Sequence, residues 1–113
     1  MNLTKKELQE ILDDLKIPVN EGIQSDENTN TPVRIVYWDY LWEPISASGE
    51  EYNTNVTYQI SFFSIIPRHE KLIELRKNLR KKGIRPIIQH EYDLETKRHH
   101  SFFAIEVLEN IEE

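Results

Sequence analysis

Apolar and polar residues alternate most clearly in the middle of the chain, over residues 33–42 and 55–66. Both segments are rich in β-branched and aromatic residues, which suit a pleated and half-buried backbone. In the second segment the apolar positions recur at every second residue: Val56, Tyr58, Ile60 and Phe62. This period of two predicts a strand with one buried and one solvated face. Residues 43–54 are rich in turn formers, so we predict a long β-hairpin over residues 33–66.

A helix is predicted before this hairpin, over residues 4–16. Four apolar residues recur there at the spacing of one helical face: Leu8, Ile11, Leu12 and Leu15. Thr4 and Glu7 form a capping-box pattern, and Pro18 ends the helix because the residue before a proline is disfavoured in the α conformation. Residues 19–31 are rich in turn-forming and acidic side chains, so we predict a mobile loop there.

A second helix is predicted over residues 67–82. Pro67 suits its first position, and Gly83 is a typical stop after its last turn. Its buried face comes from four aliphatic residues: Leu72, Ile73, Leu75 and Leu79. The basic residues near its end interact favourably with the negative pole of the helix dipole and so stabilise the helix.

A second hairpin is predicted over residues 84–108, and the acidic residues 109–113 form a frayed tail. The strands of this hairpin cover residues 84–91 and 98–108. Pro86 cannot donate a backbone hydrogen bond, so we expect its strand at a sheet edge or a bulge.

The predicted order of elements is therefore α-β-β-α-β-β within a single domain, residues 1–113. The simplest architecture for this order is an α+β fold: a mostly antiparallel four-stranded sheet with two helices packed on one face and a long first hairpin. The first strand is apolar on both faces, which indicates burial on both sides. Two interpretations stay open for Trp38 and Trp42: they cover a local core, or they contact a neighbouring subunit.

Charge is unevenly distributed along the chain. Residues 68–85 contain eight basic and two acidic residues, a net charge of +6, whereas the whole chain carries −6, so the remainder carries −12. A basic helix on an acidic body is typical of a solvated face, a nucleic-acid contact, or a head-to-tail contact between copies. We favour subunit contact over nucleic acid, because the overall charge is negative and the basic residues are not interleaved with aromatic ones.

The chain contains no cysteine, which excludes disulfides, thiolate metal sites and cysteine nucleophiles. It has no apolar run near the ~18 residues that a membrane span needs, and no signal-peptide pattern at its start. We therefore expect no membrane partner, and a protein that stays in a cytoplasm or is packed into something assembled there.

Catalytic and metal-binding patterns are weak. His90 and His100 could face each other across the last hairpin, with Glu91 and Asp93 near, but a third spaced ligand is missing. The three glycines are isolated, so no phosphate-binding loop exists, and no nucleophile elbow surrounds the serines. We predict no catalytic residues, no metal and no cofactor.

Five segments carry a family resemblance: RIVYWDYLWE at 34–43, ASG at 47–49, VTYQISF at 56–62, LIEL at 72–75 and IQHEYD at 88–93. Together they resemble small tail proteins of long-tailed bacteriophages that infect Gram-positive hosts. The resemblance covers about residues 32–109 and is similar to the tail-terminator or tail-completion group. Members of that group are small α/β subunits that form a ring, often sixfold, which caps the tail tube and joins it to the head.

The resemblance implies an assembly protein. Its expected partners are further copies of itself, in a ring such as a hexamer, the tail-tube protein and the head-tail connector; nucleic acid is not expected. Its expected locations are the virion and, during assembly, the host cytoplasm. The basic residues of the second helix would meet acidic groups of the next copy, among them Glu106 and Glu109. The predicted subunit interface comprises Arg76, Lys77, Arg80, Lys81, Trp38, Trp42, Asp13 and Asp14.

Three alternatives remain open at this point. A head-completion connector protein is the nearest one. A small nucleic-acid-binding module would use the basic helix 68–85, and its binding would weaken steeply with salt. A regulator would bind another protein through the aromatic hairpin.

Overall fold

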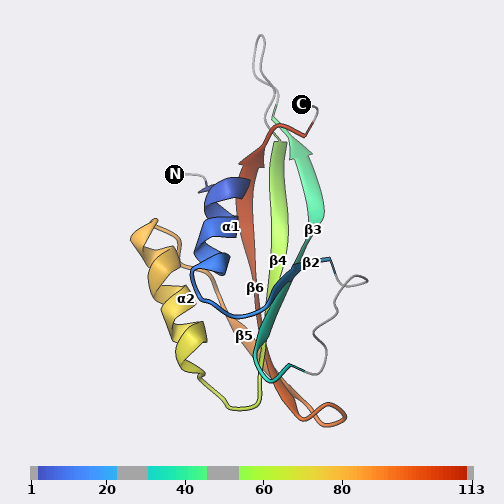
Figure 1. Cartoon of the computed structure of the whole chain (residues 1–113). Helices are drawn as coiled ribbons and strands as arrows, with labels where there is room; N and C mark the ends of the chain where they lie inside the picture. Colours follow the sequence, from blue (N-terminus) through green and yellow to red (C-terminus); the bar gives the residue numbers. More distant parts are fainter. Residues whose placement is uncertain (1–2, 23–30, 46–53, 112–113) are drawn as a thin grey trace.

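The computed structural model describes residues 3–22, 31–45 and 54–111 (Figure 1). These ranges contain two helices and six strands. In chain order they are β1 (Leu3–Thr4), α1 (Lys5–Asp13), β2 (Val19–Glu21), β3 (Arg34–Pro44), β4 (Thr54–Ser64), α2 (Glu70–Lys81), β5 (Gln89–Asp93) and β6 (Arg98–Glu109).

The six strands form one mixed sheet. The order across it is β1-β6-β4-β3-β2, and β5 also pairs with β6. β5 pairs with the first part of β6 and β1 with its last residues, so both lie along the same edge of that strand. The long strands pair antiparallel, whereas β1 and β2 each pair in parallel with a neighbour. β2 forms the opposite edge, alongside residues 35–37 of β3.

The predicted four-stranded, mostly antiparallel sheet is wrong. β1 and β2 are two and three residues long, too short for a period of two to show in the sequence. β2 lies in the segment predicted as a loop. It is fixed by the pairing of Val19 with Ile35, and the backbone N–H of Gly22 donates to the carbonyl oxygen of Tyr37 at 2.8 Å just beyond it. Tertiary pairing therefore produces these strands where local propensity is weak.

The capping box predicted for α1 is confirmed. The backbone N–H of Glu7 donates to the hydroxyl of Thr4 at 3.2 Å, and the N–H of Thr4 donates to the Glu7 carboxylate at 3.1 Å. The helix ends at Asp13, earlier than the predicted Lys16, which has a positive φ of 59°. Lys82 and Glu7 form an ion pair of 3.4 Å between α2 and α1.

The hydrophobic core lies between the helices and one face of the sheet (Figure 1). Burying these side chains is the main term that holds the fold together, at about 25 cal/mol per Å² of apolar surface removed from water. The fully buried aliphatic and aromatic members are Leu8, Leu12, Leu15, Ile35, Val56, Tyr58, Ile60, Phe62, Leu75, Leu79 and Val107. Both helices of the described ranges lie on this face, so neither of them covers the other face of the sheet (Figure 1).

A β-bulge interrupts the pairing of β3 with β4. Trp38 pairs with Gln59 and Asp39 with Tyr58, but Leu41 pairs with Thr57, so Tyr40 is the extra residue. Side chains of paired residues share a face. The bulge therefore changes which residues of β3 point to which side beyond Tyr40.

Helix α2 begins later than predicted, at Glu70. His69 caps it through its side chain, which accepts the backbone N–H of Lys71 at 3.0 Å. Gly83 follows the helix with φ +80°, a conformation that glycine adopts without strain, and the chain turns back along the helix. The strand predicted at 84–91 begins only at Gln89, because Pro86 cannot pair.

Three other predictions fall wholly or partly outside the described ranges. The tip of the first hairpin, at residues 46–53, lies outside them, as do residues 23–30 of the predicted loop. In the predicted acidic tail, Glu109 is the last residue of β6.

Candidate interaction surfaces

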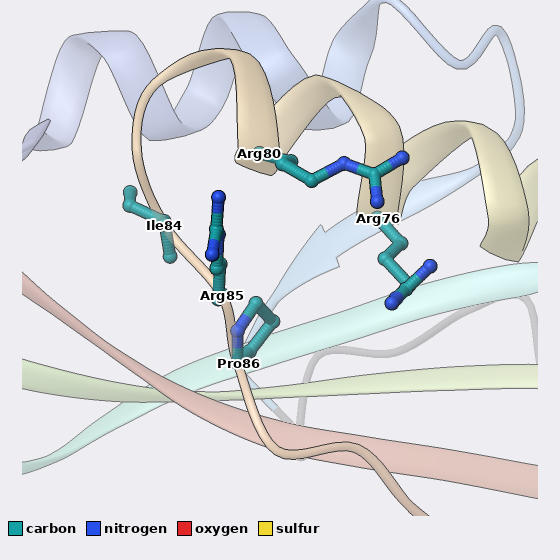
Figure 2. Close-up of a pocket in the computed structure, with 5 residues that line it drawn as sticks. All are labelled: Arg76, Arg80, Ile84, Arg85 and Pro86. Carbon is teal, nitrogen blue, oxygen red and sulfur yellow. The ribbon is translucent and has the colours of Figure 1, made fainter.

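Three arginines surround a hollow beside α2, shown in Figure 2. Arg76 and Arg80 are four residues apart and therefore lie on the same side of the helix. Arg85 comes from the segment that turns back after Gly83. Ile84 and Pro86 complete the lining, and the cavity volume is about 270 Å³. We call this feature the arginine hollow.

The three guanidinium groups of the arginine hollow have no counterion within the described part of the chain. No hydrogen bond or ion pair there engages them. Glu74, the nearest acidic residue in sequence to Arg76, pairs with Lys71 at 3.6 Å. Arginine is charged at every physiological pH, so like charges are held together around one cavity.

A second hollow of about 330 Å³ continues the first along α2. It shares Arg76 and Pro86 with the arginine hollow. Its other lining residues are Arg68, Leu72, Ile73, Ile88 and His90. The groove beside α2 therefore has an aliphatic floor and several cationic groups along its length.

The remaining charged residues of the predicted interface lie elsewhere. Lys77 and Lys81 are exposed on α2 but do not line the arginine hollow. Asp13 and Asp14 are exposed at the end of α1, just before the chain crosses to β2. That these charges meet between copies stays a prediction.

The acidic partners proposed from the sequence differ in their surroundings. The hydroxyl of Tyr58 donates to the Glu109 carboxylate at 2.6 Å. Burial first, and then this hydrogen bond, raises the pKa of Tyr58 well above its ordinary value. Glu109 is therefore engaged within its own chain, whereas Glu106 is exposed on β6.

The two tryptophans do not share a face, contrary to their even spacing in the sequence. Trp38 pairs with Gln59 on the helix-free face, but the bulge at Tyr40 puts Trp42 opposite Val56 on the other face. Trp38 is half-buried, whereas Trp42 is 57% exposed. A shared local core of both tryptophans is therefore excluded.

The outer part of β3 forms an exposed aromatic edge, which we define as Tyr40, Leu41 and Trp42. Within the described ranges β2 pairs only with residues 35–37 of β3, so the strand beyond them is the sheet edge. All three side chains are exposed by 45–57%. The indole N–H of Trp42 donates to the Asp39 carboxylate at 2.6 Å, which fixes the ring's orientation.

The histidines do not assemble a metal site. His90 pairs with Ser101, and Glu91 with His100, so His90 and His100 point to opposite faces of the hairpin. The expectation that they face each other is wrong. Among the described residues no group of three or more His, Cys, Asp or Glu side chains is arranged to hold a metal ion.

Comparisons with known proteins add no identification: neither a protein-family model nor a curated protein matches this chain. Neither described helix has the length and apolar character needed to cross a membrane.

Sequence reasoning found Arg76 and Arg80 but missed that Arg85 joins them. The helix stop at Gly83 followed by Pro86 was the available signal, since it turns the chain back beside α2.

Proposed function

We propose that this protein is a structural subunit of a long-tailed bacteriophage, of the tail-terminator or tail-completion type. Its copies associate head to tail into a ring at the head-proximal end of the tail tube, and the ring joins the tail to the head. The tail-tube protein and the head-tail connector are its partners in the virion. The resemblance over residues 32–109 supports the phage assignment, and the surfaces of the fold support the ring.

The observation that carries the proposal is the exposure of large apolar side chains on opposite edges of one sheet. The aromatic edge belongs to β3, on the side of β2. The segment after α2 exposes Ile87 by 85% next to β5, at the other end of the strand order, and Ile87 and Tyr40 line one hollow of about 540 Å³. Trp42 does not line that hollow, so Trp42 and Ile87 are two unlike contact points, which suit a heterologous contact that repeats until a ring closes. An isologous dimer would instead use one surface twice.

Trp42 is suited to be the anchor of this contact. Tryptophan and tyrosine are the residues most enriched among those that dominate interface energies. The hydrogen bond to Asp39 orders the indole before any partner arrives. Ordering a side chain in advance lowers the entropy lost on binding, about 0.5–1.5 kcal/mol for each immobilised side chain.

The same surfaces serve the nearest alternative, a head-completion connector protein, because such a protein also forms part of a ring. The bulge at Tyr40 and the position of Pro44 on the outer strand argue against simple strand addition at this edge. Both are devices that block edge-to-edge pairing. Contact through side chains is therefore the mode that the edge favours.

The test is to inactivate each edge separately and then mix the products. The two variants are Trp42→Glu, on the aromatic edge, and Ile87→Glu, on the opposite edge. We expect native mass spectrometry to show a ring for the wild type and a monomer for each variant alone. An equimolar mixture should give a heterodimer and nothing larger, because each variant keeps the one edge that the other lacks.

Leu94→Glu is the matched control. Leu94 is 81% exposed in the β5–β6 turn and lies neither on the aromatic edge nor in the segment after α2, so this variant should form rings as the wild type does. If the two edge variants stay monomeric when mixed, or if each still forms rings alone, the head-to-tail contact is wrong. Far-ultraviolet circular dichroism of each variant confirms that it is folded.

A further inference from the structure

We propose that the arginine hollow is a binding site for a phosphate group. This inference goes beyond the assembly role and does not rest on it. It rests on the geometry of three guanidinium groups, Arg76, Arg80 and Arg85, around one cavity of about 270 Å³ (Figure 2).

The hollow concentrates positive charge that the described part of the chain does not neutralise. Its arginines lie within residues 68–85, the segment of net charge +6. None of them has an acidic partner among the described residues. Three like charges around one cavity repel each other, and the repulsion is strongest where the cavity walls exclude water. An oxyanion in the cavity attracts all three guanidinium groups and offsets their mutual repulsion. The electrostatic energy of the hollow is therefore lowest when an anion is bound.

Phosphate fits this arrangement better than a carboxylate does. The planar guanidinium group binds oxyanions with two parallel N–H donors, so three arginines offer more donors than the two oxygens of one carboxylate accept. A phosphate has more acceptor oxygens and, as a dianion, more charge to balance the three cations. Ile84 and Pro86 close one side of the hollow and cannot compete for these donors.

The phosphate group can come from a small ion or from a nucleic-acid backbone. The groove supports a second cationic position next to the first, since Arg68 lines the adjoining hollow. The chemistry at the arginine hollow is the same for both sources. The experiment therefore probes inorganic phosphate and a short DNA duplex separately.

The first arm measures the thermal unfolding midpoint of the full chain in inorganic phosphate and in chloride at equal ionic strength. A ligand that binds only the folded state raises this midpoint. We expect phosphate to raise it for the wild type. The double variant Arg80→Gln/Arg85→Gln should bind phosphate about ten- to a hundredfold more weakly, because hydrogen bonds between charged groups are lost.

The matched control is Lys77→Gln/Lys81→Gln. It removes two positive charges from the same helix but none from the lining of the hollow. We expect it to respond to phosphate as the wild type does. The substitutions at Lys77, Arg80 and Lys81 lie on the exposed side of α2 and leave its buried leucines unchanged. Thermal unfolding midpoints measured in chloride check that each variant is folded.

The second arm measures binding of a short DNA duplex over a salt series. Duplex binding that free phosphate competes away, and that only the arginine variant loses, assigns the site to a backbone phosphate. Stabilisation by phosphate without duplex binding assigns it to a small phosphate. Equal responses of both double variants, to either probe, or no response of the wild type to both, would overturn the proposal.

Discussion

Phe63 and His100 stack face to face on the helix-free side of the sheet. Their ring centroids are 4.5 Å apart and their planes differ by 8°. The stack belongs to one row across four strands, because Arg34 lies 4.0 Å above the Phe63 ring and Glu91 contacts His100 Nδ1 at 2.8 Å. This row gives the uncovered face of the sheet an ordered structure without a helix above it.

The row should stabilise the fold through direct coupling between its two rings. A double-mutant cycle with Phe63→Leu and His100→Leu should give an interaction free energy of about 0.5–1.5 kcal/mol, the range of aromatic pairs beyond their buried area. Urea unfolding of the four proteins measures it. Strict additivity of the two single changes would show that the stacking contributes nothing beyond burial.

Alkaline pH should weaken the fold through Tyr58. The raised pKa means that the folded chain favours the neutral hydroxyl, so its contribution is complete below about pH 10, the ordinary tyrosine value, and declines above it. Tyr58→Phe removes the hydrogen bond to Glu109 and this titration together. The wild type should exceed the variant in free energy of unfolding at pH 8, by about 1–3 kcal/mol, and by less at pH 11. A difference that stays constant over this range would contradict the assignment.

Asp39 should affect association more than folding. Asp39→Ala frees the indole of Trp42, so the ordering cost is met only on binding. Ring formation should weaken by about two- to twelvefold, which corresponds to 0.5–1.5 kcal/mol, while the free energy of unfolding changes by no more than about 0.5 kcal/mol. Sedimentation over a concentration series and urea unfolding test the two halves independently. Unchanged association would show that the ordered indole does not contribute to ring formation.

Asp14 stands at the end of α1 where the helix dipole disfavours a negative charge. The last turn of this helix contains no basic residue. Asp14→Lys should therefore raise the free energy of unfolding by about 0.3–1 kcal/mol at low salt, and Asp14→Asn by less. The gain should shrink as salt is added, since the charge is exposed. A loss of stability in Asp14→Lys would show that the carboxylate has a favourable role in the fold.

The long elements of this fold were predictable because their patterns are long. The period of two over Val56 to Phe62 identified β4, and the leucine spacing identified both helices. β1 and β2 were missed because pairing with β6 and β3 creates them, and two or three residues carry no period. The predicted four-stranded sheet failed for this reason.

The surfaces were predictable only in part. The basic residues of α2 stood out, but the position of Arg85 depends on how the chain turns after Gly83. The even spacing of Trp38 and Trp42 predicted a shared face, and the bulge at Tyr40 separates them. A single extra residue in a strand reverses every later side chain, and nothing in the local sequence marks its position.

Native mass spectrometry of the purified chain over a concentration series shows whether its copies associate head to tail. Head-to-tail assembly should give a closed oligomer as the largest species, with a mass of about six times the 13.5 kDa of one chain if the ring is sixfold. A monomer at every concentration, or a dimer that grows no further, would contradict head-to-tail assembly.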